Sequence, residues 1–169
     1  MKLSFRHLAA VTTGLAFSLI LLGVYTGAMG AGLACAGRWP LCDGWLGLFP
    51  ANWPSFIEWF HRFVAMIAGF FILGVGISAW RKGRNRWIRY ASAVAVVVLP
   101  VQVLLGANTI FNFGVVAQVL HHAAALLILT ALTVTTTLAF VDSDSPAAST
   151  GDTATAGTGS DERARSTDD

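Results

Sequence analysis

Three histidines lie inside long apolar segments of the sequence, where ionisable side chains are costly and usually mark function. His61 lies about five residues into one segment, and His121 and His122 lie six and seven residues into another. At 1.5 Å rise per residue, all three would sit roughly 8–10 Å below the same membrane boundary. Two helices running in one direction would then offer imidazoles at one depth, as in bundles that bind haem iron axially.

Other interpretations of these histidines remain open. A lone histidine in a membrane is commonly hydrogen-bonded to a neighbouring helix. Zinc is less well supported, because no third or fourth ligand of a suitable type lies nearby. His121 and His122 are about 100° apart around a helix, so only one should face a given neighbour. Alanines follow both by one turn, at Ala124 and Ala125, and periodicity does not choose between them.

Glu58 is the one acidic residue within an apolar segment. His61 at i+3 and Arg62 at i+4 share its face of the helix. One interpretation is structural: an acid near a helix N-terminus that favours the dipole and pairs with Arg62. The other is a carboxylate beside bound haem that handles protons or polarises a substrate. Arg62 could pair with a haem propionate.

Cys35 and Cys42 are the only cysteines, with Gly37 and Pro40 between them to let the chain turn. We expect a disulfide, which would stabilise so short a loop by roughly 2.5 kcal/mol on the chain-entropy model. Two free thiols packed in the loop are the alternative. An exposed bridge in a tight loop can also be redox-active, and the sequence does not separate that from a structural bridge.

Four apolar segments are long enough to position these residues across a membrane: 8–27, 56–80, 90–110 and 115–140. The chain is 55% apolar and only 12% charged, with a mean hydropathy of +0.65. A soluble domain carries about twice that charged fraction. A cleaved signal peptide is the rival interpretation of the first segment, but its apolar stretch is long for one. The sequence therefore predicts an all-α membrane protein, with a four-transmembrane-helix bundle over residues 1–141.

The basic residues predict the orientation of the bundle, because Lys and Arg accumulate on the cytoplasmic side. Lys2 and Arg6 precede the first segment, and five basic residues lie in the connection at 81–89. We expect a multi-pass protein of the cell membrane with both termini cytoplasmic and the 28–55 loop outside. The acidic segment 142–169 lacks apolar periodicity and is expected to be a disordered cytoplasmic tail. No basic stripe alternates with aromatic residues, so nucleic acid is not an expected partner.

The motifs together resemble the haem A synthase family of respiratory oxidase assembly. The similarity covers roughly residues 8–140. It includes a Gly-rich run ending at Cys35, the Trp-Pro-Leu-Cys sequence at 39–42, and the Glu-x-x-His-Arg motif at 58–62. Gln-x-x-Leu-Gly at 102–106 and Leu-His-His at 120–122 resemble two further family patterns. By that match His121 is the ligand and His122 replaces a glutamine. Gly27 stands near the place where the family usually has an arginine.

This resemblance implies an oxidoreductase that converts haem O to haem A by oxidising a methyl group to a formyl group, assisted by a bound haem b. It assigns His61 and His121 to haem iron and places Glu58 near the reacting haem. Family members typically have eight helices in two similar halves. We therefore expect a homo-oligomer, at least a dimer, in membrane lipid, with a haem O synthase or an oxidase assembly protein as a further partner. The alternatives are a non-catalytic b-type haem membrane cytochrome or haem-delivery subunit, and a thiol–disulfide membrane protein.

Overall fold

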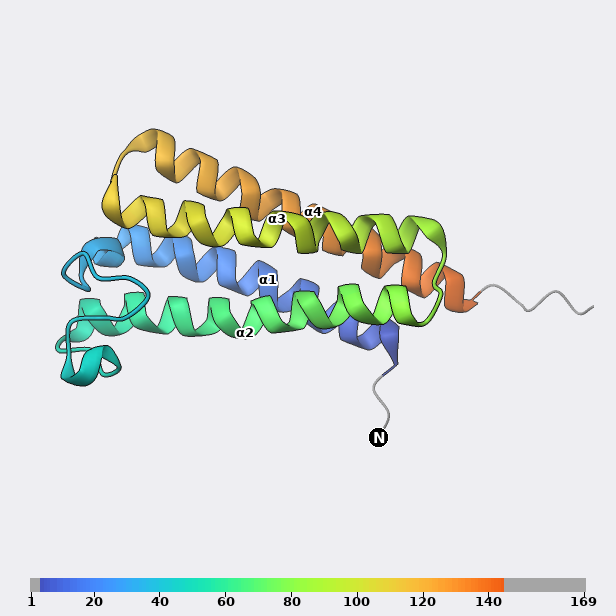
Figure 1. Cartoon of the computed structure of the whole chain (residues 1–169), viewed down its shortest axis with the longest axis horizontal. Coiled ribbons are helices and arrows are strands. Elements are labelled where there is room, and N and C mark those ends of the chain that lie inside the picture. Colours follow the sequence, from blue (N-terminus) through green and yellow to red (C-terminus); the bar gives the residue numbers. More distant parts are fainter. Residues whose placement is uncertain (1–3, 145–169) are drawn as a thin grey trace, which may run out of the picture.

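The computed structural model describes residues 4–144, and these form four long helices that run along one another (Figure 1). The helices are α1 (Phe5–Ala28), α2 (Trp53–Arg81), α3 (Arg86–Phe111) and α4 (Val115–Asp144). Two short 3-10 turns, Ala31–Leu33 and Trp45–Gly47, lie in the connection between α1 and α2. Each long helix has a mean hydropathy of 2.0 or 2.1 over its most apolar window, sufficient to cross a bilayer. The expected all-α membrane fold is confirmed.

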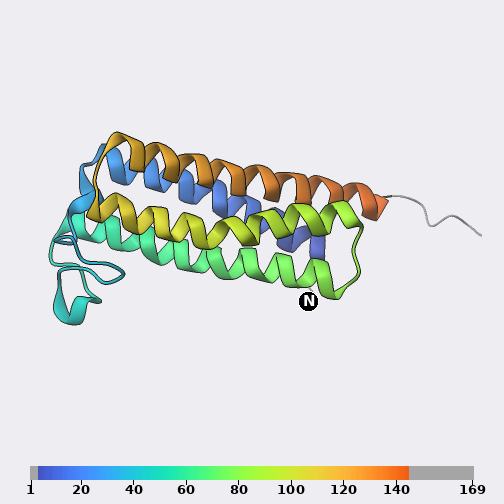
Figure 2. The same cartoon turned by 45° about the horizontal axis from the view of Figure 1, so that its top comes forward.

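The four helices form a closed ring of neighbours. Helix α1 packs against α2 and α4, α3 packs against α2 and α4, and the α3–α4 contact is the most extensive. The long 29–52 connection and the turn at 112–114 lie at one end of the bundle, called the loop end here (Figures 1 and 2). The start of α1, the α2–α3 turn and the end of α4 lie at the opposite end.

Three of the helices begin before the apolar segments that predict them, α1 at Phe5 rather than at residue 8. Polar residues cap the other two. The Asn52 side chain accepts a hydrogen bond from the Ser55 backbone N–H, so α2 begins at Trp53 rather than at residue 56. The Asn85 side chain accepts from the Trp87 backbone N–H, so α3 begins at Arg86 rather than at residue 90. The expected disordered tail falls mainly on residues 145–169, outside the described residues, and stays a prediction.

The buried apolar core fills the middle of the bundle and the end opposite the loops. One cluster joins all four helices at mid-height, and a second lies near the start of α1: Ala16, Ile72, Ala95, Ile128, Ala131 and Leu132, then Phe5, Val75, Ala79, Ile88 and Ala139. Many of these residues are alanines, which let helices approach closely in a membrane. Both clusters lie away from the loop end, and the polar residues described next lie in the loop half of the bundle.

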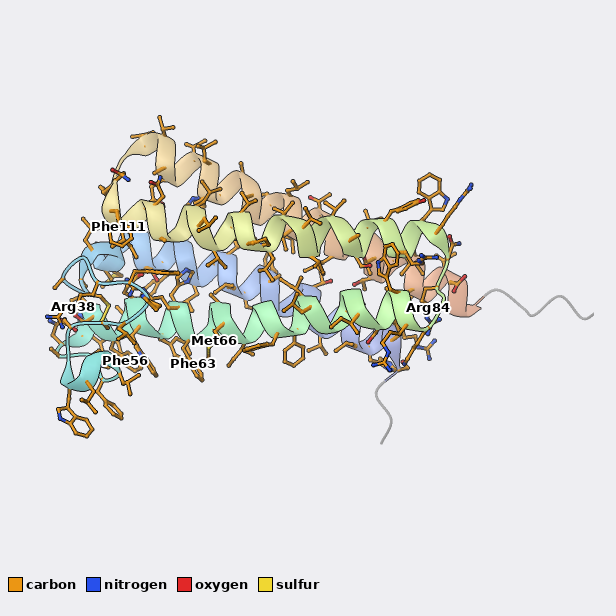
Figure 3. All side chains as sticks on the ribbon, in the orientation of Figure 1. Arg38, Phe56, Phe63, Met66, Arg84 and Phe111 are labelled. Carbon is orange, nitrogen blue, oxygen red and sulfur yellow. A yellow bond between two sulfur atoms is a disulfide. The ribbon has the colours of Figure 1, made fainter. Side chains whose placement is uncertain are left out.

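Large apolar side chains cover the outside of the bundle. Phe56, Phe63 and Met66 project from α2 on the side away from α3 (Figure 3), and each is more than a third exposed. Arg38 and Arg84 lie at opposite ends of the molecule. An apolar surface of this length with charges at its ends is what a lipid bilayer requires. The chain is therefore a multi-pass membrane protein.

Candidate functional site

His61 lies against the backbone of the neighbouring helix α1. A Cβ atom built on Gly23 would stand only 3.1 Å from His61 Cε1, closer than ordinary carbon contacts. The His61 Nδ1 atom is buried and has no hydrogen-bond partner among the described residues. A buried polar nitrogen without a partner is unusual in a folded protein, and it indicates a group that awaits a ligand or a proton exchange.

His121 repeats this arrangement on the other pair of helices. A Cβ on Gly106 of α3 would lie 3.1 Å from His121 Cε1. Its Nδ1 is likewise buried and unpartnered within residues 4–144, and its Nε2 lies 3.4 Å from the Gln102 side-chain nitrogen. The Gln102 amide oxygen is also buried without a partner in that range. Each helical hairpin thus has one glycine–imidazole contact. Both imidazoles lie in the loop half of the bundle, and each has an Nδ1 without a hydrogen-bond partner among residues 4–144.

The two imidazoles lie at similar heights. His61 is eight residues into α2 and His121 is six residues into α4, which places them roughly 12 Å and 9 Å along their helices. Both helices run from the loop end, as the sequence predicted from their order.

His122 differs from His121 in its hydrogen bonding. Its Nδ1 lies 2.7 Å from the carbonyl oxygen of Gln118, one turn earlier on the same helix. That carbonyl can only accept, so Nδ1 of His122 donates. The two rings are perpendicular, with centroids 6.0 Å apart. His121 faces α3 and Gln102, whereas His122 is tied to its own helix, and this favours His121 as the ligand.

Glu58 and Arg62 form an ion pair at the start of α2. Arg62 Nε donates to Glu58 Oε1 at 2.9 Å, and the two side chains are only 14% and 8% exposed. Arg62 Nη1 also donates to backbone carbonyl oxygens of the loop, at 2.7 Å to Leu41, 2.9 Å to Arg38 and 3.4 Å to Pro40. The Glu58–Arg62 contact expected from their i,i+4 spacing is present, while the bonds to the loop had no signal in the sequence.

The expected Cys35–Cys42 disulfide is present. Both cysteines are buried, at 1% and 0% exposure, and their sulfur atoms lie 3.9 Å and 3.7 Å from the Ser55 carbonyl oxygen. A bridge so covered is inaccessible to a second thiol unless the loop opens. This environment favours the structural interpretation of the bridge over a redox-active one.

Asp43 and Ser55 attach the loop to α2, and sequence reasoning assigned neither a role. Ser55 Oγ donates to Asp43 Oδ2 at 2.7 Å and the Ala51 backbone N–H donates to Oδ1 at 3.3 Å. The Ser55 hydrogen bond is the main cause that holds the pKa of Asp43 below its usual value, and partial desolvation opposes it. The only sequence signal was their position, directly after a cysteine and just inside a capped helix start.

Gly23 and Gly106 lie against the two imidazoles, and sequence reasoning gave neither a place beside them. In the sequence, Gly106 was noted only as the end of the Gln-x-x-Leu-Gly pattern and Gly23 only as part of a glycine-rich run. Their alignment with His61 and His121 depends on how α1 packs on α2 and α3 on α4. Nothing local in the sequence encodes that register.

The two imidazoles fit a metal that is already bound in a macrocycle better than they fit a bare metal ion. Within residues 4–144 there is no group of three His, Cys, Asp or Glu side chains that could hold a bare metal ion. Two imidazoles from two parallel helices can supply axial ligands to the iron of a planar macrocycle. The glycines beside them leave room for the rings to turn, because any larger residue there would crowd Cε1. The residues present therefore fit haem.

The fold and site define a class: multi-pass helical membrane proteins with a pair of imidazoles carried by two helices. The family model described as "Cytochrome oxidase assembly protein" (COX15-CtaA) matches residues 49–133, half of the chain. This stretch contains Glu58, His61, Arg62 and His121. The chain belongs to this family, whose relatives include haem A synthases.

Haem A synthases and protohaem IX farnesyltransferases are among the proteins similar to this chain. Haem A synthase of Bacillus licheniformis is 32% identical over 83% of this chain and 47% of its own length. Haem A synthase of Shouchella clausii is 32% identical over 79% of this chain and 46% of its own length. A protohaem IX farnesyltransferase of Halobacterium salinarum is 38% identical over 63% of this chain but only 23% of its own length. The chain spans about half the length of the haem A synthases it matches.

Proposed function

We propose that this chain is a haem A synthase unit, an oxidoreductase that converts a methyl group of haem O to the formyl group of haem A for terminal oxidase assembly. The observation that carries the proposal is the pair of imidazoles of His61 and His121, each with a buried Nδ1 that has no hydrogen-bond partner among residues 4–144. Glu58 lies one helical turn before His61. Membership of the family and the similarity to two haem A synthases support it.

Each residue of the site has a distinct role in this proposal. His61 and His121 would hold the iron of a haem b, which supplies redox chemistry when bound. Converting a methyl to a formyl group with water as the oxygen source releases four protons and four electrons. An external electron acceptor would take the electrons, and Glu58 would accept protons. Arg62 keeps one nitrogen, Nη2, outside the hydrogen bonds to Glu58 and the loop, and this nitrogen can pair with a propionate.

We propose further that the working enzyme contains at least two copies of this chain. The described residues offer one pair of His61 and His121, so one bundle supplies axial ligands for one haem. A haem cofactor and a haem substrate together need a second set. The matched haem A synthases are about twice as long as the region aligned with this chain. Native mass spectrometry of the detergent-purified protein, with and without haem, tests this stoichiometry; a purely monomeric active enzyme contradicts it.

A haem O synthase is the proposed source of the substrate, with an oxidase assembly protein as a further partner. In Halobacterium salinarum, a segment similar to this chain belongs to a polypeptide named protohaem IX farnesyltransferase. Transfer of a farnesyl group to protohaem yields a haem with the prenyl side chain that haem O carries. Two activities in one polypeptide can hand over an apolar product without releasing it into the bilayer.

The proposed orientation places the loop end outside the cell membrane and both termini in the cytoplasm. Its support is the basic segment Arg81–Arg89, which lies at the bundle end where α1 begins (Figure 1). Cysteine substitutions at Trp45 and Trp87, labelled from either side of sealed vesicles, test it. Labelling of residue 45 from the cytoplasmic side would contradict it.

The decisive experiment is the haem content and product of the purified protein. The chain is expressed where haem O is supplied, and the extracted haems are identified by mass. Haem A, or its hydroxylated precursor, is the expected product. Bound haem b without conversion, even with an added electron acceptor, would overturn the proposal in favour of a non-catalytic b-type haem cytochrome or haem-delivery protein.

A further inference from the structure

The loop closed by the disulfide presents a cradle of backbone oxygens to one nitrogen of α2. The carbonyls of Leu41, Arg38 and Pro40 all belong to the 35–42 ring, and all accept from Arg62 Nη1. The two shorter bonds, 2.7 Å and 2.9 Å, have full hydrogen-bond length. Charge-assisted bonds of this kind are stronger than neutral ones. The ring therefore fixes the position of the Arg62 head group.

The same head group fixes the Glu58 carboxylate. A guanidinium is planar and rigid, so holding Nη1 also sets the position and direction of Nε. Nε donates to Glu58 Oε1 at 2.9 Å, and both side chains are largely shielded from water. An unbroken series of contacts thus runs from the ring carbonyls through Arg62 to Glu58, which is one turn from His61.

The ring is held in place independently of Arg62. Its two cysteines are buried against the Ser55 carbonyl, the Cys42 backbone N–H donates to Gly47 O at 2.8 Å, and Asp43 accepts from Ser55 Oγ. Opening the disulfide would release the segment that carries the three carbonyls while leaving Arg62 and Glu58 themselves unchanged. The bridge and the arginine can therefore be perturbed separately.

We propose that Arg62 is a positioning residue for the Glu58 carboxylate, and that the Cys35–Cys42 ring acts through its carbonyls to hold Arg62 in that role. The proposal rests on the proposed function, in which Glu58 accepts protons beside the haem. It assigns the loop a task in catalysis through its backbone carbonyls. Positional errors of about 1 Å at a reacting group cost on the order of 100-fold in rate.

Three variants separate positioning from general stability. Arg62→Lys keeps the charge but loses the rigid fork that joins the loop to Glu58. The double variant Cys35→Ser/Cys42→Ser keeps Arg62 and opens the ring. Ser55→Ala is the matched control. It removes the two hydrogen bonds of the Ser55 hydroxyl to the loop, but it leaves the disulfide, the Ser55 carbonyl beside it and the Arg62 bonds to the ring carbonyls unchanged.

Two measurements are made on each full-length variant loaded with haem b. The first is turnover of haem O, separated into kcat and KM, with haem content as a control. We expect the lysine and double-serine variants to keep haem b and KM while kcat falls about 10-fold to 100-fold. Ser55→Ala should keep kcat even where its melting temperature falls. Lysine keeps the positive charge that can pair with a propionate, so haem b should stay bound. Unchanged kcat in Arg62→Lys overturns the proposal. So does a fall in turnover that is fully accounted for by lost haem b, because Arg62 would then act only through its propionate contact.

The second measurement is the infrared difference spectrum on haem reduction, in which the Glu58 band is identified by its loss in Glu58→Gln. The band should shift in Arg62→Lys and in the double-serine variant and stay in place in Ser55→Ala. This readout needs no haem O conversion. If wild-type protein fails to make haem A but the band shifts as expected, the proposed function fails and the positioning role stands. An unshifted band in Arg62→Lys, which retains the disulfide, overturns the positioning role even where turnover is seen.

Discussion

Replacing Gly23 by alanine should weaken haem binding by crowding His61. The added Cβ would lie 3.1 Å from His61 Cε1, whereas relaxed carbon contacts are about 3.5–4.0 Å. The His61 ring must therefore move by about 0.4–0.9 Å. This displacement is comparable to or larger than the roughly 0.5 Å within which a functional group must be held. Without haem the half-buried ring can turn aside. When it binds iron it cannot, so the strain falls on the bound state.

The magnitude follows from the cost of crowding a packed site, about 1–3 kcal/mol. Expressed as affinity, this is a loss of about 5-fold to 150-fold. Gly14→Ala is the matched control, since it lies on the same helix and a Cβ there meets nothing within 4 Å. Both variants gain the same helix propensity, about 1 kcal/mol in water, so their difference isolates the contact with His61.

The assay is titration of purified apoprotein with haem b, followed by the low-spin absorbance, together with melting temperatures of both variants. We expect Gly14→Ala to match the wild-type protein in haem affinity. Gly23→Ala should bind haem about 5-fold to 150-fold more weakly while remaining folded. Equal affinity and equal spectra for the two variants would refute the reasoning, because His61 would then not need the space that Gly23 leaves.

Three further predictions concern the site and its loop. His61→Ala and His121→Ala should each abolish the low-spin haem absorbance, whereas His122→Ala should keep it. If His122→Ala abolishes this absorbance and His121→Ala does not, His122 is the iron ligand instead of His121. Glu58→Gln should retain haem b but lose conversion of haem O, as product analysis would show. Unchanged turnover would mean that Glu58 has only a structural role, as the ion-pair partner of Arg62. The lowered pKa of Asp43 means that its contribution to loop stability is present at neutral pH and is lost as pH falls below the usual aspartate value, about 4. Reduction of the buried disulfide by a phosphine should accelerate in that acid range, and in Asp43→Asn it should be fast throughout; a wild-type rate that does not respond to acid would contradict this.

The sequence alone determined the features that depend on local pattern. Runs of about 20 apolar residues have one stable form in a bilayer, because the backbone must satisfy its own hydrogen bonds there, and so the four helices could be predicted. The Glu58–Arg62 contact followed from i,i+4 spacing. The Cys35–Cys42 bridge followed from two cysteines in a short loop with Gly and Pro between them. The helix starts at Trp53 and Arg86 were missed, because their caps are polar and lie outside the apolar runs.

Only the tertiary structure decided the features that depend on how helices pack. Which imidazole of His121 and His122 faces the neighbouring helix is set by the rotation of α4, and the apolar pattern around that helix is too even to fix it. Gly23 and His61 are 38 positions apart in the chain, and their approach depends on the register between α1 and α2. The loop carbonyls around Arg62 are backbone atoms, which every residue possesses, so no side-chain pattern can reveal them. Their positions follow only once the loop has folded against α2.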